Sequence, residues 1–299
     1  MKVVYSSRYE LALPGHIWPT AKYRLTAAAL GPGFTIVEPS PASWEDLATV
    51  HTHEYLGRLR DDQLSADDIA TLELPWRPGF ADAFLLMAGG TIDAARAALV
   101  DGAAAHLGGG LHHAFANHGE GFCPVNDIAV AIRVLQSSRR PGRGVHGSVQ
   151  RAAVVDLDVH HGNGTAMIFE RDDSVFTFSM HQQHNYPMFK PRGDLDVGLA
   201  DGTVDAVYLE RLTASLPIVM ASRPDLIVYV AGADPYEQDR LGGLCLTKRG
   251  LAERDRLVID AARGAGVPLV TVLAGGYAAD VADTVAIHAA TIRAMASAY

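Results

Sequence analysis

Short apolar runs alternate along the chain with longer segments of helical character. Six runs rich in β-branched residues predict strands, and because they are continuously apolar, they indicate strands covered on both faces. The predicted strands are Val3–Tyr5, Thr35–Val37, Ala153–Val159, Val175–Met180, Leu226–Ala231 and Leu269–Leu273. The predicted helices are Trp44–Arg60, Ala81–Val100, Asp127–Leu135, Asp205–Ala221, Lys248–Ala262 and Asp280–Ala298.

This alternation predicts βαβ units, and hence an α/β fold with a mainly parallel sheet. Asn126 is the expected N-cap of the third helix, and Gly264 or Gly266 is the expected end of the fifth. Gln136–Gln150 is rich in Ser, Gly and Arg. It is typical of a solvated loop, with a patch for a partner as the weaker alternative. Residues 1–299 are therefore expected to form one domain.

Composition narrows the class of protein. Of 299 residues, 48% are hydrophobic and 20% are charged, which is typical of a globular chain and not of a disordered one. With 25 basic and 34 acidic residues, the net charge of −9 argues against nucleic-acid binding. Two cysteines, Cys123 and Cys245, cannot form a disulfide framework. No apolar leader and no apolar span of roughly 18 residues is expected, so we predict a cytoplasmic protein without a membrane partner.

Three polar side chains occupy alternate positions near the end of the third predicted strand. Asp156, Asp158 and His160 should therefore point to one face. Burial of two carboxylates and an imidazole without partners is costly, and a metal such as zinc accepts both kinds of ligand. The sequence favours a metal site here. The alternative is a pair of buried aspartates held by backbone donors, with His160 as a core histidine.

Asp234 follows the predicted strand Leu226–Ala231 and can supply a third ligand. Alone it would more often be a loop or capping aspartate. Together with Asp158 and His160 it gives two carboxylates and one histidine, which leaves a coordination position for water or substrate.

Two further segments carry candidate chemistry. His112 and His113 follow a run of three glycines and are candidates for metal ligands, for acid–base groups or for surface histidines. Tyr277 follows the predicted strand Leu269–Leu273 on a glycine-rich turn. A phenol at that place can donate to an oxyanion, and the alternative is a half-buried structural tyrosine.

Taken in order, GGGLHHA, GEGFCPVND, DLDVHHGNG, GADPYEQDRLGG and LAGGY resemble the zinc-dependent histone deacetylase family. That family includes bacterial acetoin-utilisation and acetylpolyamine amidohydrolase relatives. The resemblance extends from about Gly89 to Tyr277 and points most to class IV and its bacterial relatives. It implies a single arginase/deacetylase-like α/β domain, with a mainly parallel, eight-stranded sheet and helices on both faces.

The resemblance implies a metal centre and a catalytic set. Asp158, His160 and Asp234 match the ligands of one catalytic zinc ion. In the catalytic set, His113 matches the general base and His112 its companion histidine. Asp156 matches the carboxylate that orients His112, and Tyr277 matches the phenol that donates to the oxyanion.

The resemblance also implies a substrate site and a second ion site. Gly121 matches a glycine whose carbonyl accepts from the substrate amide. Phe122 and the segment around Tyr186 match the walls of an acyl-lysine tunnel, and Leu241 matches its rim. The residues that match a structural potassium site are Asp156, Asp158, His160, Ser179 and Met180.

Two positions depart from the class I pattern. Asn163 stands where class I members carry an aspartate that orients the second histidine. An uncharged amide should raise the basicity of His113 less than a carboxylate does. At the rim, Leu74-Pro75-Trp76-Arg77-Pro78 occupies the region of the aspartate that grips the substrate backbone, and no counterpart is assigned.

The predicted reaction is removal of an acyl group from an acylated amine, with Nε-acyl-lysine of proteins as the favoured substrate. Class IV resemblance raises the expectation of long acyl chains, and iron(II) or cobalt(II) would also suit the ligands. Acetylpolyamine hydrolysis is the main alternative, favoured by the negative net charge. The others are a binuclear manganese ureohydrolase of the arginase type, which shares the fold, and a non-catalytic acyl-lysine binder or scaffold.

Overall fold

The computed structural model describes residues 1–137 and 149–299. Its centre is an eight-stranded sheet in the order β2-β1-β3-β8-β7-β4-β5-β6, with every neighbouring pair parallel. The strands are β1 (Lys2–Val4), β2 (Thr35–Val37), β3 (Ala103–His106), β4 (Ala152–Asp156), β5 (Val175–Gln182), β6 (Leu195–Leu199), β7 (Leu226–Val230) and β8 (Leu269–Val272). The predicted α/β class and parallel sheet are confirmed.

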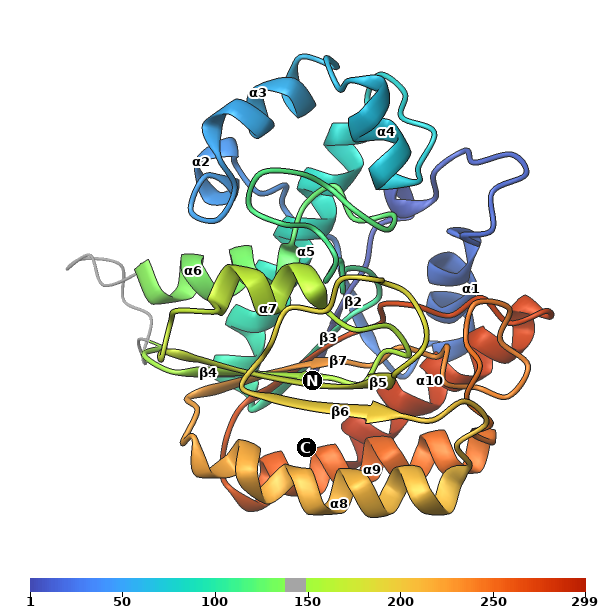
Figure 1. Ribbon diagram of the computed structural model, residues 1–299. Helices are drawn as coiled ribbons and strands as arrows, with labels where there is room; N and C mark the ends of the chain where they lie inside the picture. Colours follow the sequence, from blue (N-terminus) through green and yellow to red (C-terminus); the bar gives the residue numbers. More distant parts are fainter. Residues whose placement is uncertain (138–148) are drawn as a thin grey trace.

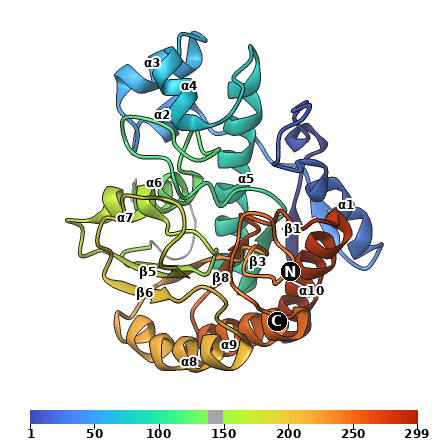
Figure 2. The same cartoon turned by 45° about the vertical axis from the view of Figure 1, so that its right-hand side comes forward.

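Helices cover both faces of the sheet (Figures 1 and 2). They are the 3₁₀ helix η1 (Ser7–Tyr9) and α1 (Ala21–Leu30), α2 (Trp44–Leu47), α3 (His53–Arg60), α4 (Ala66–Leu72), α5 (Phe80–Asp101), α6 (Asp127–Ser137), α7 (Asn163–Phe169), α8 (Asp205–Ala221), α9 (Lys248–Gly264) and α10 (Val281–Ala298). Helices α5, α6 and α7 lie on one face, whereas α1, α8, α9 and α10 lie on the other. Helices α2–α4 lie on the same side of the sheet as α5, but farther from the sheet.

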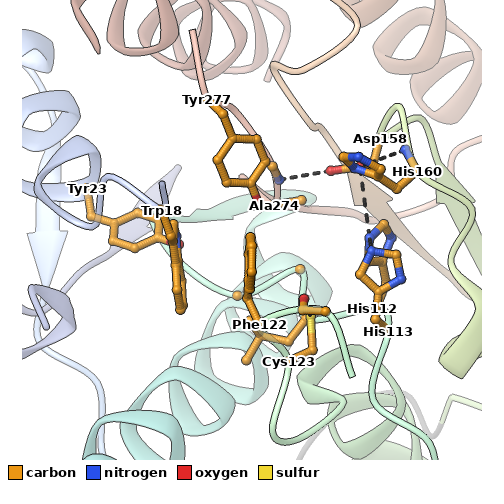
Figure 3. A pocket seen from close by; sticks show the side chains of 15 residues that line it. Trp18, Tyr23, His112, His113, Phe122, Cys123, Asp158, His160, Ala274 and Tyr277 are labelled. Carbon is orange, nitrogen blue, oxygen red and sulfur yellow. Dashed lines mark hydrogen bonds and ion pairs between the residues drawn. The ribbon is translucent and has the colours of Figure 1, made fainter. Parts of the chain in front are cut away.

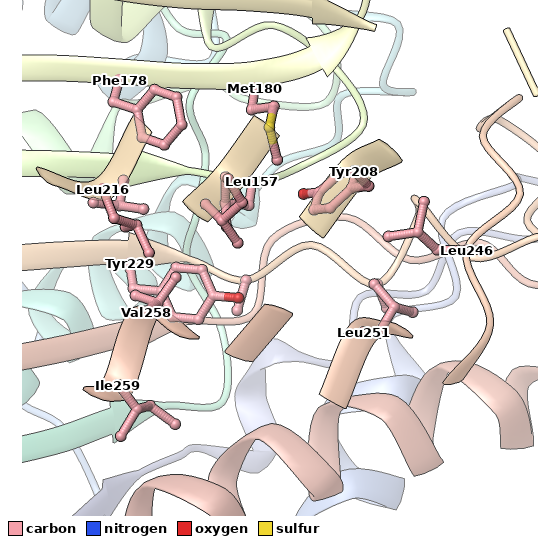
Figure 4. Packing of buried hydrophobic residues seen from close by; sticks show 14 of the residues in the cluster. Leu157, Phe178, Met180, Tyr208, Leu216, Tyr229, Leu246, Leu251, Val258 and Ile259 are labelled. Carbon is pink, nitrogen blue, oxygen red and sulfur yellow. The ribbon is translucent and has the colours of Figure 1, made fainter. Parts of the chain in front are cut away.

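The core between the sheet and helices α8 and α9 shows why the chain folds in layers. Phe178 and Met180 of β5 point toward Leu216 of α8 and Val258 of α9, and all four are buried (Figure 4). Strands covered on both faces need apolar side chains at successive positions, which explains the continuous runs in the sequence. The sheet is thereby held as a rigid platform for the loops at its edge.

Six of the eight strands lie where the apolar runs predict them. One of them, β2, is not covered on both faces as expected, because it is the edge strand of the sheet and all three of its residues are exposed. The other two, β3 and β6, were not predicted. Strand β3 reads AAAH, and alanine has low strand propensity, but the strand is fully buried between β1 and β8. Strand β6 reads LDVGL and lies at the sheet edge next to β5, where its polar positions are exposed. Burial and pairing, which a local pattern does not contain, decided both.

The helix prediction for Trp44–Arg60 was wrong in one respect, because two helices occupy that range. The chain leaves α2 after Leu47, and α3 starts afresh after Thr52, whose side chain accepts from the Tyr55 N–H. Thr52 acts as an N-cap, which requires an extended residue before the helix. Helices α1, α4 and α7 were not predicted, and α7 begins inside a glycine-rich motif that is typical of a turn.

The predicted helix ends are confirmed. The Asn126 side chain accepts from the Ala129 N–H at 3.0 Å and so caps α6. Helix α9 ends at Gly264, and Gly266 follows with a positive φ of 68°. The predicted loop Gln136–Gln150 begins inside α6, which reaches Ser137. Residues 138–148, with all three of its arginines, lie outside the described residues.

One expectation about membranes needs correction. Helix α5 has 22 residues and an 18-residue window with a mean hydropathy of 1.5, enough by length and composition to cross a bilayer. In the structure, 78% of that window is buried against the rest of the protein. A fully packed core helix passes the same test of length and apolarity, so this feature is weak support for a membrane segment.

Candidate active site and metal centre

The candidate site lies at the carboxyl ends of the central strands. Because all eight strands are parallel, the loops after β3, β4, β5, β7 and β8 leave from the same edge of the sheet. Ligand sites of open α/β sheets form at this edge. These loops, together with Asn163 at the start of α7, carry the site residues that the sequence singles out beyond the strands themselves.

The chain after β4 differs from the predicted strand Ala153–Val159. Strand β4 ends at Asp156, and carboxylates take over the backbone hydrogen bonds that a ladder would otherwise satisfy. Asp156 Oδ1 accepts from the Asp158 N–H at 3.1 Å, and Asp158 Oδ1 accepts from the His160 N–H at 3.0 Å. These local turns, and not strand alternation alone, place the side chains together.

Asp158, His160 and Asp234 form a buried group with metal-ligand chemistry. One potential ligand atom from each lies within 4.8 Å of the others. Asp234 Oδ2 is buried without a hydrogen-bond partner, which is costly unless a cation or water satisfies it. A Cβ at Gly275 would lie 1.9 Å from that oxygen and 2.6 Å from Asp158 Oδ2. The residues therefore fit a metal ion, and only glycine leaves room for them.

The protonation of this group also fits a cation site. Burial alone lowers the pKa of His160, but the carboxylates of Asp158 and Asp234 raise it to about 10. Burial and the Asp158 carboxylate raise the pKa of Asp234 to about 7. Burial raises the pKa of Asp158, but His112 and His160 outweigh it and hold that pKa well below its usual range. The metal-free cluster thus shares a proton that a bound cation would displace.

His112 and His113 meet side by side next to this group. Their Nε2 atoms lie 3.1 Å apart, and Asp156 Oδ2 lies 2.7 Å from His112 Nδ1. Burial lowers the pKa of His112, but Asp156 and Asp158 raise it to about 9. Burial and the charge of His112 hold the pKa of His113 well below its usual value. At neutral pH the first ring is a cation and the second is neutral, a division of acid and base roles.

Asn163, the first residue of α7, lies behind the neutral histidine. Its Oδ1 lies 2.8 Å from His113 Nδ1, as the departure from the class I pattern leads one to expect. Its Nδ2 donates to Glu120 Oε1 at 2.8 Å. The sequence reading of this region did not single out Glu120.

Aromatic side chains line the approach to the histidines. A cavity of about 150 Å³ is bordered by Phe122, Tyr186 and Leu241, and it reaches His113, His160 and Tyr277. Figure 3 shows Phe122 and Tyr277 between Trp18 and Tyr23 on one side and the histidine pair and Asp158 on the other. The Phe122 and Tyr277 rings meet edge to face, with centroids 6.1 Å apart.

Gly121 lies where its backbone approaches both the base and the wall. Its φ is +51°, and a Cβ would lie 2.8 Å from His113 Cδ2 and from the Tyr186 ring. A side chain would therefore be strained and would clash. Gly121 borders the cavity, and its carbonyl accepts from Cys123 Sγ at 3.2 Å.

Tyr277 is held by the loop after β7. Its backbone N–H donates to Asp239 Oδ2 at 2.6 Å, and Asp239 Oδ1 accepts from the N–H groups of Leu241 and Gly242. Burial, with Asp158 and Asp234, raises the pKa of Tyr277 well above its usual value. The phenol therefore stays protonated and remains a donor.

Some of the five residues predicted to hold potassium are neighbours in the structure. Ser179 and Met180 are buried on β5, and Ser179 pairs with Asp156 of β4 in the parallel register. The Ser179 hydroxyl lies 3.0 Å from His181 Nδ1. The potassium site stays a prediction.

Two residues near the site escaped the sequence analysis besides Glu120. Glu73, next to the rim segment that showed no counterpart, borders the entrance cavity and adopts a left-handed conformation with φ of 53°. Lys22 of α1 is fully buried, donates to the Ala274 carbonyl at 2.6 Å and lies 5.4 Å from the Tyr277 ring. An acidic residue before a Pro-rich loop and a lysine in an apolar helix are weak signals in a sequence.

Comparison with known proteins gives one consistent result. A model of the histone deacetylase domain matches residues 18–292. An uncharacterized protein from Picosynechococcus is 39% identical, with 99% of each chain covered. Histone deacetylase 2 of Arabidopsis thaliana is 32% identical over 93% of this chain and 74% of its own. The crystal structure of the HDA15 HD domain superposes with a TM-score of 0.78 at 25% identity, covering 99% of this chain and 91% of that one.

Proposed function

This chain belongs to the histone deacetylase family and is a hydrolase of the amide bond of acetylated amines, and we propose that it removes acyl groups from Nε-acyl-lysine of proteins or peptides by a zinc-dependent reaction. One observation carries the proposal. Asp158 and His160 of the buried metal-ligand group, a neutral His113 and a protonated Tyr277 line one pocket, which Phe122 and Trp18 also border.

The residues of the chain divide the work of amide hydrolysis. His113 Nε2, unprotonated at neutral pH, takes a proton from water as the water attacks the amide carbonyl. His112, held as a cation by Asp156, stabilises negative charge that develops beside it. The Tyr277 phenol donates to the oxyanion, and His113 then returns its proton to the leaving amine.

Asp158, His160 and Asp234 would hold the metal ion. When bound, the ion supplies Lewis-acid polarisation of the carbonyl and lowers the pKa of water at the site. Once the shared proton has left, the three side chains would offer two carboxylates and one imidazole nitrogen to it, and Gly275 leaves the space.

The cavity is suited to a narrow methylene chain that ends in a flat amide group. Phe122 and Tyr186 border it, and Tyr186 lies perpendicular to His113 with ring centroids 5.0 Å apart. The methylene chain of an acyl-lysine would pack between these rings, while the Gly121 carbonyl accepts from its amide N–H.

A panel of substrates tests this proposal. We would measure carboxylate release by zinc-loaded protein from Nε-acyl-lysine peptides with acetyl to myristoyl groups, and from acetylputrescine and acetylspermidine. The control is His113→Ala, which removes the base without removing a metal ligand. Turnover of an acyl-lysine peptide that depends on His113 is expected. Absence of turnover across the panel, with metal bound, would contradict the proposal.

Acetylpolyamine hydrolysis is a second candidate because of one observation. The Glu73 side chain is exposed at the entrance cavity, where a carboxylate would attract the second ammonium group of a polyamine. If this reading is right, acetylspermidine should be turned over with a higher kcat/KM than any acetyl-lysine peptide, and Glu73→Gln should raise its KM more than that of the peptide.

A further inference from the structure

Glu120 connects several parts of the site without bordering the metal group. It lies between Gly119 and Gly121 and is half-buried. Its Oε1 accepts from Asn163 Nδ2 at 2.8 Å and from the Tyr186 hydroxyl at 3.2 Å. His118 Nε2 lies 3.6 Å from the other oxygen. Burial raises the pKa of Glu120, but nearby His118 and the donors Asn163 and Tyr186 outweigh it and lower that pKa, so the group is ionised at neutral pH.

An ionised carboxylate only accepts hydrogen bonds, and this fixes the direction of the whole chain of contacts. The Asn163 amide must turn its NH₂ to Glu120, so its Oδ1 faces His113 Nδ1 at 2.8 Å. An amide oxygen also only accepts, so His113 Nδ1 carries the hydrogen. The lone pair is then on Nε2, the atom beside His112 in the pocket.

We propose that Glu120 is a positioning residue that holds His113 in its Nδ1–H tautomer through Asn163. Glu120 thereby supplies, through Asn163, the negative charge that an aspartate at position 163 would place directly next to His113. This inference rests on the proposed function, since it assigns Nε2 of His113 as the base. It explains how the site keeps a negative charge behind His113 although residue 163 is an asparagine.

The first test is Glu120→Gln, which keeps the size of the side chain but removes its charge. Its amide can turn either group to Asn163, so the orientation of Asn163 is no longer fixed. We expect kcat to fall about 10- to 100-fold, with KM and metal content unchanged. Glu54→Gln is the matched control, because it makes the same chemical change at an exposed glutamate of α3, and its kcat should stay at the wild-type value.

The second test places Asn163→Asp in both backgrounds. With Glu120 present, two carboxylates would face each other across the present 2.8 Å contact, and kcat should fall. With Glu120→Gln, the amide at position 120 can donate to the new carboxylate, which accepts directly from His113. The double variant should recover about 10-fold in kcat over Glu120→Gln alone. The proposal would be overturned if the double variant lost as much kcat as the two single variants together. A merely structural role of Glu120 would not turn the effect of Asn163→Asp from a loss of kcat into a gain.

A third measurement does not depend on activity. Nitrogen-15 NMR of histidine-labelled protein reports which ring nitrogen carries hydrogen, and the His113 signal is assigned by its loss in His113→Ala. We expect a single Nδ1–H form in the wild type and a mixture of tautomers in Glu120→Ala. An unchanged tautomer together with a wild-type kcat in Glu120→Gln would overturn the inference. An inactive wild type with the expected tautomers would instead count against the proposed function alone.

Discussion

Tyr277 and Asp158 border the same pocket but depend on different neighbours. Tyr277 is placed through its backbone by Asp239, and its phenol is kept protonated by burial and nearby carboxylates. Asp158 accepts from the N–H groups of His160 and Gly275, at 3.0 and 2.9 Å. Substituting one residue at a time can therefore separate oxyanion stabilisation from metal retention.

Tyr277→Phe removes only the phenol oxygen. The fold and the metal group should remain, because the Asp239 contact is made by the backbone. Loss of one donor to an oxyanion reduces kcat about 10²- to 10³-fold. The measurement is kcat on the best acyl-lysine peptide, with metal content determined in parallel. Turnover at the wild-type rate would contradict the role given to Tyr277.

Asp158→Ala removes one of the three proposed ligands. The remaining pair, His160 and Asp234, should not hold an ion through gel filtration, since catalytic zinc sites use three protein ligands. Metal per chain, measured by mass spectrometry, should fall from about one to near zero. Asp260→Asn on the exposed face of α9 serves as the control and should keep the metal. A full complement of zinc in Asp158→Ala would refute this ligand set.

Helix α9 shows how an element far from the pocket holds its loops. Arg254 is fully buried and pairs with Asp255, and its Nη1 donates to the Gly232 carbonyl at 2.6 Å. The same nitrogen lies 3.4 Å from the Leu157 carbonyl. Those two carbonyls belong to the loops that carry Asp234 and Asp158. The helix therefore fixes the spacing of two metal-binding loops through one guanidinium.

Arg254→Met leaves the Asp255 carboxylate buried without its cation. Removal of one partner from a buried pair costs about 3–5 kcal/mol, so the free energy of unfolding should fall by that amount. Urea unfolding followed by circular dichroism measures it. Arg256→Ala, an exposed site on the same helix, should change stability little. A small loss in Arg254→Met would mean that Asp255 finds other donors.

At the scale of the whole molecule, buried neutral histidines link stability to pH. His51 Nδ1 lies 3.0 Å from the Phe115 carbonyl, and its Nε2 accepts from the Asn126 N–H at 3.0 Å. Burial lowers the pKa of His51 from its usual 6.5 to about 4. His106 is similar, with burial lowering its pKa to about 3. The unfolded chain binds these protons near pH 6.5, whereas the folded protein does not.

Stability should therefore be fully present above pH 6.5 and fall as the pH drops toward 4. One such proton contributes a slope of about 1.4 kcal/mol per pH unit. His51→Gln keeps a donor and an acceptor but cannot be protonated, so its slope should be shallower by that amount. Urea unfolding of metal-free protein between pH 4 and 7 measures the two slopes. Equal slopes would show that His51 is protonated in the folded state.

The sequence by itself determined the fold class and most of the candidate site. Continuous apolar runs mark six of the eight strands. Of these, β4, β7 and β8 are buried throughout, whereas β2 at the sheet edge is exposed. The order of the motifs around His113, Asp158, Asp234 and Tyr277 indicated the family that the comparisons show. These features are local, because each depends on a few residues that are neighbours in the sequence.

Only the tertiary structure decided the features that depend on distant residues. Strand β3 is a strand because β1 and β8 bury its alanines, and its own propensity does not favour one. Glu120 meets Asn163 across 43 positions of sequence, and Lys22 reaches Ala274 across 252. Such contacts arise because a parallel sheet brings the ends of separate strands to one edge. A hydrogen bond between them depends on ångström-scale distances that no local pattern contains.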